Sequence, residues 1–178
     1  MSAASISEKL DVALVAKNSS RVFRQQADVF FDEILHFEGF PDDYFSLLCR
    51  VISTPSLYKV TGAEMFLFQT YVAAEELSLD QRDKILLLLI DLYPSYANEN
   101  MCLVAADFLA RVYEPHIALN AFERILEKVV LSQQALGIAV ALGAFSGSES
   151  LEQDELLDRV RRVRVRIAEI EADLNKEA

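Results

Sequence analysis

The chain of 178 residues has few of the Cys and His side chains that typically bind zinc: two cysteines, Cys49 and Cys102, and two histidines, His36 and His116. A zinc site draws on such ligands in close spacing, typically two within a few residues of each other. These four are all more than ten residues apart, so we expect no metal and no other cofactor. Both cysteines fall in apolar stretches, where a free thiol is most often a small core residue.

Other catalytic patterns are also missing from the sequence. No motif around either histidine makes it a general base. The five glycines form no phosphate-binding loop, because none is followed by Lys and Ser or Thr. Adjacent carboxylates such as Asp42 and Asp43 point in different directions on a helix and are typical of a solvated surface. We therefore predict that the protein is not an enzyme.

The charge balance favours a basic partner. Lys and Arg number 17 against 28 Asp and Glu, and the net charge is −11. An acidic chain lacks the basic surface that neutralises nucleic-acid phosphates. The local exception is a basic run of five arginines within 159–166, and acidic residues flank it on both sides. We expect this run to close against the acidic body of its own fold or of a second copy.

One group of residues is a candidate for partner binding, because tyrosines beside carboxylates make good interface anchors. The alternative is that these tyrosines cap the core with their hydroxyls in water. The group lies near expected helix ends and consists of Tyr93, Tyr96, Asn98, Glu99, Tyr113 and Glu114.

The elements that position these residues are all expected to be helices, because apolar residues recur at helical spacing and no segment alternates like a strand. Expected caps and breakers set the bounds. The predicted helices cover 6–17, 20–38, 41–53, 62–77, 79–93, 99–113, 115–130, 133–144 and 151–175. Their predicted core comprises Phe30, Ile34, Leu48, Ile52, Phe66, Leu86, Leu89, Phe108, Leu109, Phe122, Ile125 and Leu142.

We predict a single all-α domain over 1–178, with N-terminal helices in 1–40, three antiparallel hairpins in 41–145 and a long helix over 151–175. The first helices of the hairpins open near Pro41, Leu79 and Pro115, which are 38 and then 36 residues apart. Such a period indicates hairpins stacked side by side as a small HEAT-like α-solenoid. An irregular helical bundle is the alternative.

The stretch Gln134–Gly143 and the Ser-Gly-Ser-Glu-Ser run at 146–150 carry a resemblance. They are similar to the second helix and turn of HEAT-like α-solenoid repeats, and small acidic proteins of this build occur among bacterial immunity proteins. The resemblance implies a non-catalytic inhibitor that occludes a basic toxin, such as a nuclease. It covers about Pro41–Gly147.

The last predicted helix carries an apolar seam with a/d-type spacing. Its members are Leu156, Val160, Val163, Ile167, Ile170 and Leu174. The seam either covers the last hairpin or pairs with a second chain. The alternative function is therefore a structural or regulatory α-domain that forms a homodimer through this helix.

A cytoplasmic location without membrane attachment is predicted. The apolar stretch Val12–Ala16 is too short for a secretory signal. The longest apolar runs, Ile85–Ile90 and Ala135–Phe145, fall well short of the roughly 18–20 residues that span a bilayer. Two cysteines also suit a reducing compartment.

Overall fold

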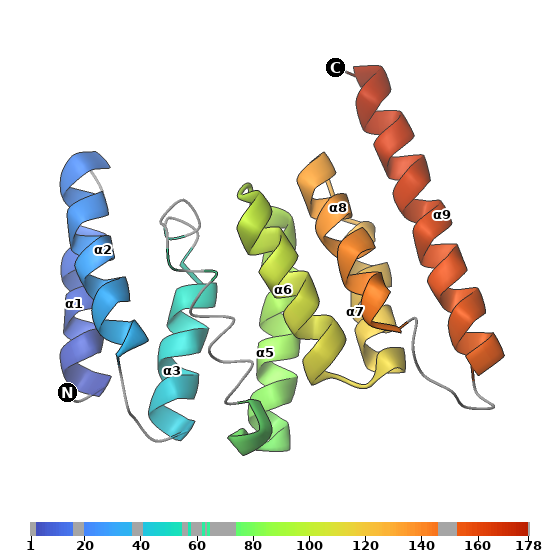
Figure 1. Cartoon of the computed structure of the whole chain (residues 1–178). Helices are drawn as coiled ribbons and strands as arrows, with labels where there is room; N and C mark the ends of the chain where they lie inside the picture. Colours follow the sequence, from blue (N-terminus) through green and yellow to red (C-terminus); the bar gives the residue numbers. More distant parts are fainter. Residues whose placement is uncertain are drawn as a thin grey trace. The chain divides into compact units, whose positions relative to one another are not determined.

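The computed structural model describes residues 3–15, 20–36, 41–54, 57, 62, 64, 74–145 and 153–177 (Figure 1). Every regular element among these residues is helical, with eight α-helices and three short 3₁₀ turns. The predicted all-α class is therefore confirmed for the described part of the chain. The chain divides into two compact units, Met1–Leu88 and Leu89–Ala178. The single domain stays a prediction.

The first unit begins with a helical pair, α1 (Ala3–Val15) and α2 (Ser20–Leu35). The apolar stripe expected on α2 is buried from Phe23 through Ala27 to Ile34, because its spacing of three and four keeps it on one face. It packs against α1, where Ile6 and Leu10 are fully buried. An ion pair between Lys9 and Glu33 joins the two helices.

Helix α3 (Pro41–Ile52) starts at the predicted proline, with Asp42 and Asp43 in its first turn. Carboxylates there complement the positive end of the helix dipole. Near its other end, Arg50 reaches α1, where it donates to the Ser7 hydroxyl and, at 2.6 Å, to Asp11. This polar contact accompanies the packing of α3 on α1.

The predicted helix over 62–77, with core residue Phe66, lies largely outside the described residues. At the first position of this predicted helix, Gly62 adopts a φ of +116°, a conformation that favours glycine. A Cβ there would also lie 2.9 Å from the Phe31 side chain. Ala74–Glu76 form a 3₁₀ turn, labelled η3.

Helix α5 (Leu79–Leu92) opens with a capping box, because the Ser78 hydroxyl accepts from Gln81 N and the Gln81 side chain accepts from Ser78 N. Gln81 also donates to Asp42 at 2.6 Å. The predicted cap is thus confirmed. The predicted core residue Leu86 is only half-buried, which corrects that assignment: the helix buries Ile85, Leu89 and Ile90 and turns the residues between them outward.

The second unit starts at the end of α5 and continues through a 3₁₀ turn, η4 (Tyr93–Ser95). Its helices are α6 (Glu99–Val112), α7 (Pro115–Leu126), α8 (Ser132–Ala141) and α9 (Gln153–Glu177). A further 3₁₀ turn, η5 (Leu142–Phe145), follows α8. Asn98 caps α6 as predicted, and its side chain accepts from Met101 N at 3.1 Å.

Two predicted helix ends in this unit are wrong. Helix α7 ends at Leu126 instead of Val130, and Ser132 is the first residue of α8 rather than its cap. Leu131 takes the cap position in an extended conformation. The carboxamide oxygen of Gln134 accepts from Val130 N and Leu131 N, each at 3.1 Å, and so satisfies two free N–H groups at this helix start.

The most extensive helix contact of the second unit joins α6 and α8. Their backbones approach closely at Gly137, where a Cβ would overlap the Tyr93 hydroxyl and lie 2.8 Å from the Cys102 carbonyl oxygen. Gly137 therefore sets the separation of the two helices. Gly143, two turns further along, has no atom within 4 Å of such a Cβ.

Helix α9 packs against α7 and α8 through its predicted seam. Val160, Val163 and Ile167 are at most 5% exposed, and Ile170 is 9% exposed. Leu156 and Leu174, at the ends of the seam, are half-buried. Of the two outcomes expected for the seam, the structure shows the first: the seam covers its own unit, and its residues do not form an exposed self-association surface.

Gly137 and Gly143 give a matched test of the α6–α8 contact. We predict that Gly137→Ala lowers the free energy of unfolding by about 1–3 kcal/mol, the usual cost of overpacking. Gly143→Ala should be neutral or stabilise by up to about 1 kcal/mol, because it only restricts the unfolded chain. Urea denaturation measures both values. Equal effects of the two substitutions would contradict the close approach at Gly137.

Candidate functional site

The three tyrosines of the predicted partner-binding group are buried. Tyr93 and Tyr96 are 0% exposed, with ring centroids 5.7 Å apart. Tyr113 is 9% exposed and packs edge-on against Phe108. Their rings therefore belong to the interior and are not presented to a partner, which corrects the prediction that they are exposed anchors.

The alternative prediction placed the tyrosine hydroxyls in water, but the Tyr93 hydroxyl is buried as well. Its oxygen lies 2.9 Å from the Gln134 carbonyl oxygen and 3.2 Å from that of Cys102, so its single proton is donated within the interior. Burial raises the pKa of the Tyr93 hydroxyl far above its ordinary value of 10.0, and the nearby Cys102 adds to this rise. Tyr93 is therefore a structural hydrogen-bond donor.

The side chain of Gln134 completes this buried polar network. Its carboxamide nitrogen donates to the carbonyl oxygens of Pro94 and Tyr96, each at 2.8 Å. Its oxygen serves the N–H groups of Val130 and Leu131 at the start of α8. One fully buried side chain thus joins the connection before α6 to the connection before α8. The role of Gln134 does not follow from the sequence, where its only signal is a polar residue on the inward side of an apolar helix.

Cys102 is buried and Cys49 is half-buried, and each histidine contacts an oxygen atom of a nearby residue. Burial raises the pKa of the Cys102 thiol to about 12, and the thiol donates to the Tyr96 carbonyl oxygen at 3.6 Å. Burial also raises the pKa of Cys49, with partial opposition from Lys84. His36 contacts the Asp32 carbonyl oxygen, and His116 lies 3.4 Å from Glu114. Within the described residues, no three His, Cys, Asp or Glu side chains gather as metal ligands would.

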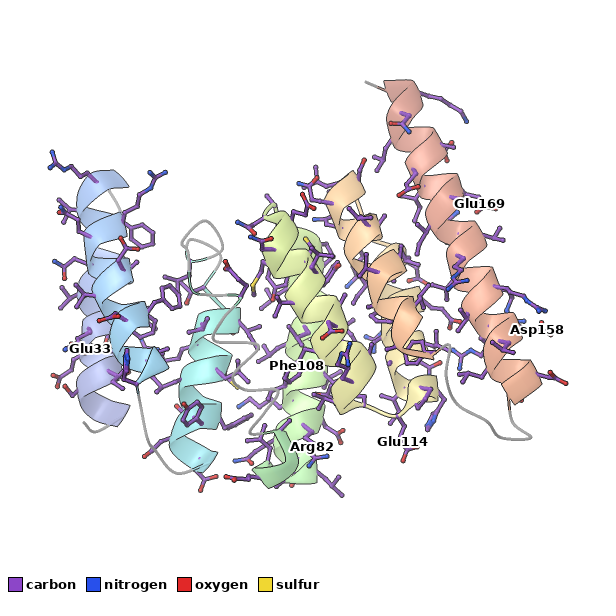
Figure 2. All side chains as sticks on the ribbon, viewed as in Figure 1. Glu33, Arg82, Phe108, Glu114, Asp158 and Glu169 are labelled. Carbon is purple, nitrogen blue, oxygen red and sulfur yellow. The ribbon has the colours of Figure 1, made fainter. Side chains whose placement is uncertain are left out.

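The polar members of the predicted group lie at opposite ends of α6. The Asn98 side chain caps the helix, and Glu99 beside it is exposed. Glu114 follows the other end, with its side chain 75% exposed (Figure 2). Because α6 has 14 residues, these ends are about 21 Å apart. The group is therefore not one compact site, and its exposed carboxylates mark the two ends of one helix.

The basic run within 159–166 on α9 was expected to contact either its own fold or a second copy. Part of it contacts its own unit. Arg159 donates to Glu123 at 2.9 Å and to Asn120 at 2.6 Å, both on α7. Arg161 pairs with Asp158, and Arg166 pairs with Glu169, both within α9. Asp158 and Glu169 point away from α8 in Figure 2. Most of these arginine charges are thus balanced locally.

Among the described helices of the second unit, only α8 has a solvent face without charge. Its exposed residues are Ser132, Leu136 and Val140, and exposed Gly143 and Ala144 follow in η5. Leu136 is 41% and Val140 59% exposed. No charged residue occurs between Lys128 and Glu149. This apolar stretch is recognisable in the sequence, but the sequence assigns no role to its outer side.

No family model matches the chain, and neither a curated protein nor a solved structure matches it. Among the helices that the structure describes, none combines the length and the apolar character needed to cross a bilayer.

The Gln134 network predicts a strong contrast between neighbouring glutamines. Gln134→Leu leaves buried backbone groups without partners at about 1–3 kcal/mol each, so we expect it to lower the free energy of unfolding by at least about 3 kcal/mol. Gln133→Ala removes one exposed bond to the Ala97 carbonyl oxygen, which water can replace, and should cost less than about 1 kcal/mol. Urea denaturation measures both, and a small loss for Gln134→Leu would contradict the network.

The raised pKa of Cys102 predicts a loss of stability in alkali. In the unfolded chain the thiol ionises near its ordinary pKa of 9.0, whereas the folded thiol stays protonated up to about pH 12. This contribution is therefore complete below pH 9 and is lost progressively as the pH rises toward 12. We expect Cys102→Ala to reduce the fall in unfolding free energy between pH 8 and pH 11. An identical fall in both proteins would show that the thiol is not protected.

Proposed function

We propose that this chain is a protein-binding module without chemistry of its own and that its partner is a basic protein. The observation that carries the proposal is how the second unit divides its polar groups. The side chains of Tyr93, Cys102 and Gln134 all donate to backbone carbonyl oxygens in the interior. Glu99 and Glu114, in contrast, lie at the surface. With a net charge of −11, the exposed carboxylates favour a positively charged partner.

The outer side of α6 carries a third carboxylate that can take part in the proposed contact surface. Asp107 lies between the two end carboxylates and is partly exposed, where Arg111 pairs with one of its oxygens at 2.7 Å. An ordinary interface covers about 800 Å² on each partner. A footprint of that size spans a helix of this length, so one partner protein can meet both ends of α6.

Binding of this kind makes the protein an inhibitor when the covered surface of the partner holds an active site. We propose a role like that of an immunity protein, in which the acidic surface occludes a basic toxin such as a nuclease. Self-association through α9 is not proposed, because Val160, Val163 and Ile167 are buried against α7 and α8.

The test starts from affinity capture in the native host at low salt, followed by binding kinetics with the captured protein. We predict that the association rate falls as salt rises, since screening shortens the reach of the charges. The double substitution Glu99→Lys with Glu114→Lys should slow association about tenfold or more without loss of fold. Surface charges of this kind contribute little to stability.

The matched control is Asp154→Lys with Glu155→Lys, which makes the same charge change at exposed positions on α9. It should slow association much less than the α6 pair. Binding that ignores salt and both pairs would contradict a basic partner. Equal effects of the two pairs would show that net charge, and not the α6 surface, governs association.

A further inference from the structure

The uncharged solvent face of α8 lies beside the carboxylates of α6. The two helices are neighbours and run in the same direction, with Gln133 at the start of α8 donating to Ala97 just before α6 (Figure 1). Gly137 is level with Cys102, because a Cβ there would lie 2.8 Å from the Cys102 carbonyl oxygen. Val140 is one turn further along α8, level with the stretch of α6 between Leu103 and Asp107.

The exposed side chains of Leu136 and Val140, four residues apart on one face of α8, form what we call the α8 strip. Leu103, on the neighbouring helix α6, is half-buried. Glu99 and Asp107 lie on the neighbouring helix α6 at an exposed and a partly exposed position, and Glu99 has no ion pair among the described residues. The surface thus combines an apolar centre with an acidic edge.

We propose that the α8 strip is the docking site for one amphipathic helix of the basic partner, with its apolar stripe on Leu136 and Val140 and its basic residues beside Glu99 and Asp107. An exposed apolar patch with a polar edge is typical of an interaction site. An amphipathic helix presents apolar side chains every three or four residues along one face, and such a stripe can lie along Leu136 and Val140. The inference rests on the proposed function for the basic character of the partner.

The size and charge of the strip favour a partner helix over a second copy of this chain. Helix α8 has 10 residues and is about 15 Å long. A strip of this length and one helix wide provides much less than the roughly 800 Å² per partner of a stable dimer. A second copy would also place its own Glu99 near this acidic edge, and like charges oppose such contact.

The probe is a synthetic helical peptide of Leu and Lys with one apolar stripe, compared with a scrambled peptide of the same composition. Fluorescence anisotropy gives the affinity, and methyl NMR spectra give the location. We expect the helical peptide to shift the methyl signals of Leu136 and Val140. Val140→Asn should weaken binding at least tenfold.

Val165→Asn on α9 is the matched control, because Val165 and Val140 are both 59% exposed. It should change the affinity less than twofold. If Val140→Asn disturbs the circular dichroism spectrum, Leu136→Gln replaces it. Equal binding of the scrambled peptide, equal effects at the two valines, or methyl shifts elsewhere would overturn the α8 strip.

Two further measurements separate this inference from the proposed function. A matching Leu and Glu peptide should bind at least tenfold more weakly than the Leu and Lys peptide, and Glu99→Lys should reverse part of that preference. If both peptides bind the strip equally, the basic partner is wrong. Sedimentation that shows a dimer lost in Val140→Asn would replace the partner helix with a second copy and overturn the inference.

Discussion

The buried carboxamide of Gln134 is the interaction on which the second unit depends. It holds the carbonyls of Pro94 and Tyr96 before α6 and the N–H groups of Val130 and Leu131 before α8. A buried polar group is costly unless all its partners are in place, so this network permits one relative position of the two helices. Gly137 then allows the contact to close.

The outer surface of the unit follows from this arrangement. With Gln134, Ile138 and Ala141 turned inward, helical spacing places Leu136 and Val140 on the solvent side of α8. The same contact buries Cys102 on α6, whereas Glu99 on that helix is exposed and Asp107 is partly exposed. Tyr93, Cys102 and Gln134 hydrogen-bond in the interior, and charge and apolar area remain on the outside, where we propose that a partner binds.

Local signals were sufficient for much of the fold. The helix starts at Pro41, Leu79 and Pro115 follow from proline and capping residues whose partners lie within one turn. The tyrosines were misassigned because the partner of Tyr93 is 41 residues away, in a different helix. Gln134 was missed for the same reason, and Leu86 was misplaced because only the neighbouring helices decide which side of α5 is covered. The apolar outer face of α8 could be read as core from the sequence, since only the packing shows that it is uncovered.

Native-state hydrogen exchange of the Val130 and Leu131 amides tests the central network most directly. Both lie in a connection between helices, where amides ordinarily exchange fast because local opening is sufficient. Because both donate to the buried Gln134 oxygen, we predict that they exchange as slowly as the interior amides of α6 and α8, through global unfolding. Exchange as fast as that of an exposed loop would show that Gln134 does not hold the two helices together.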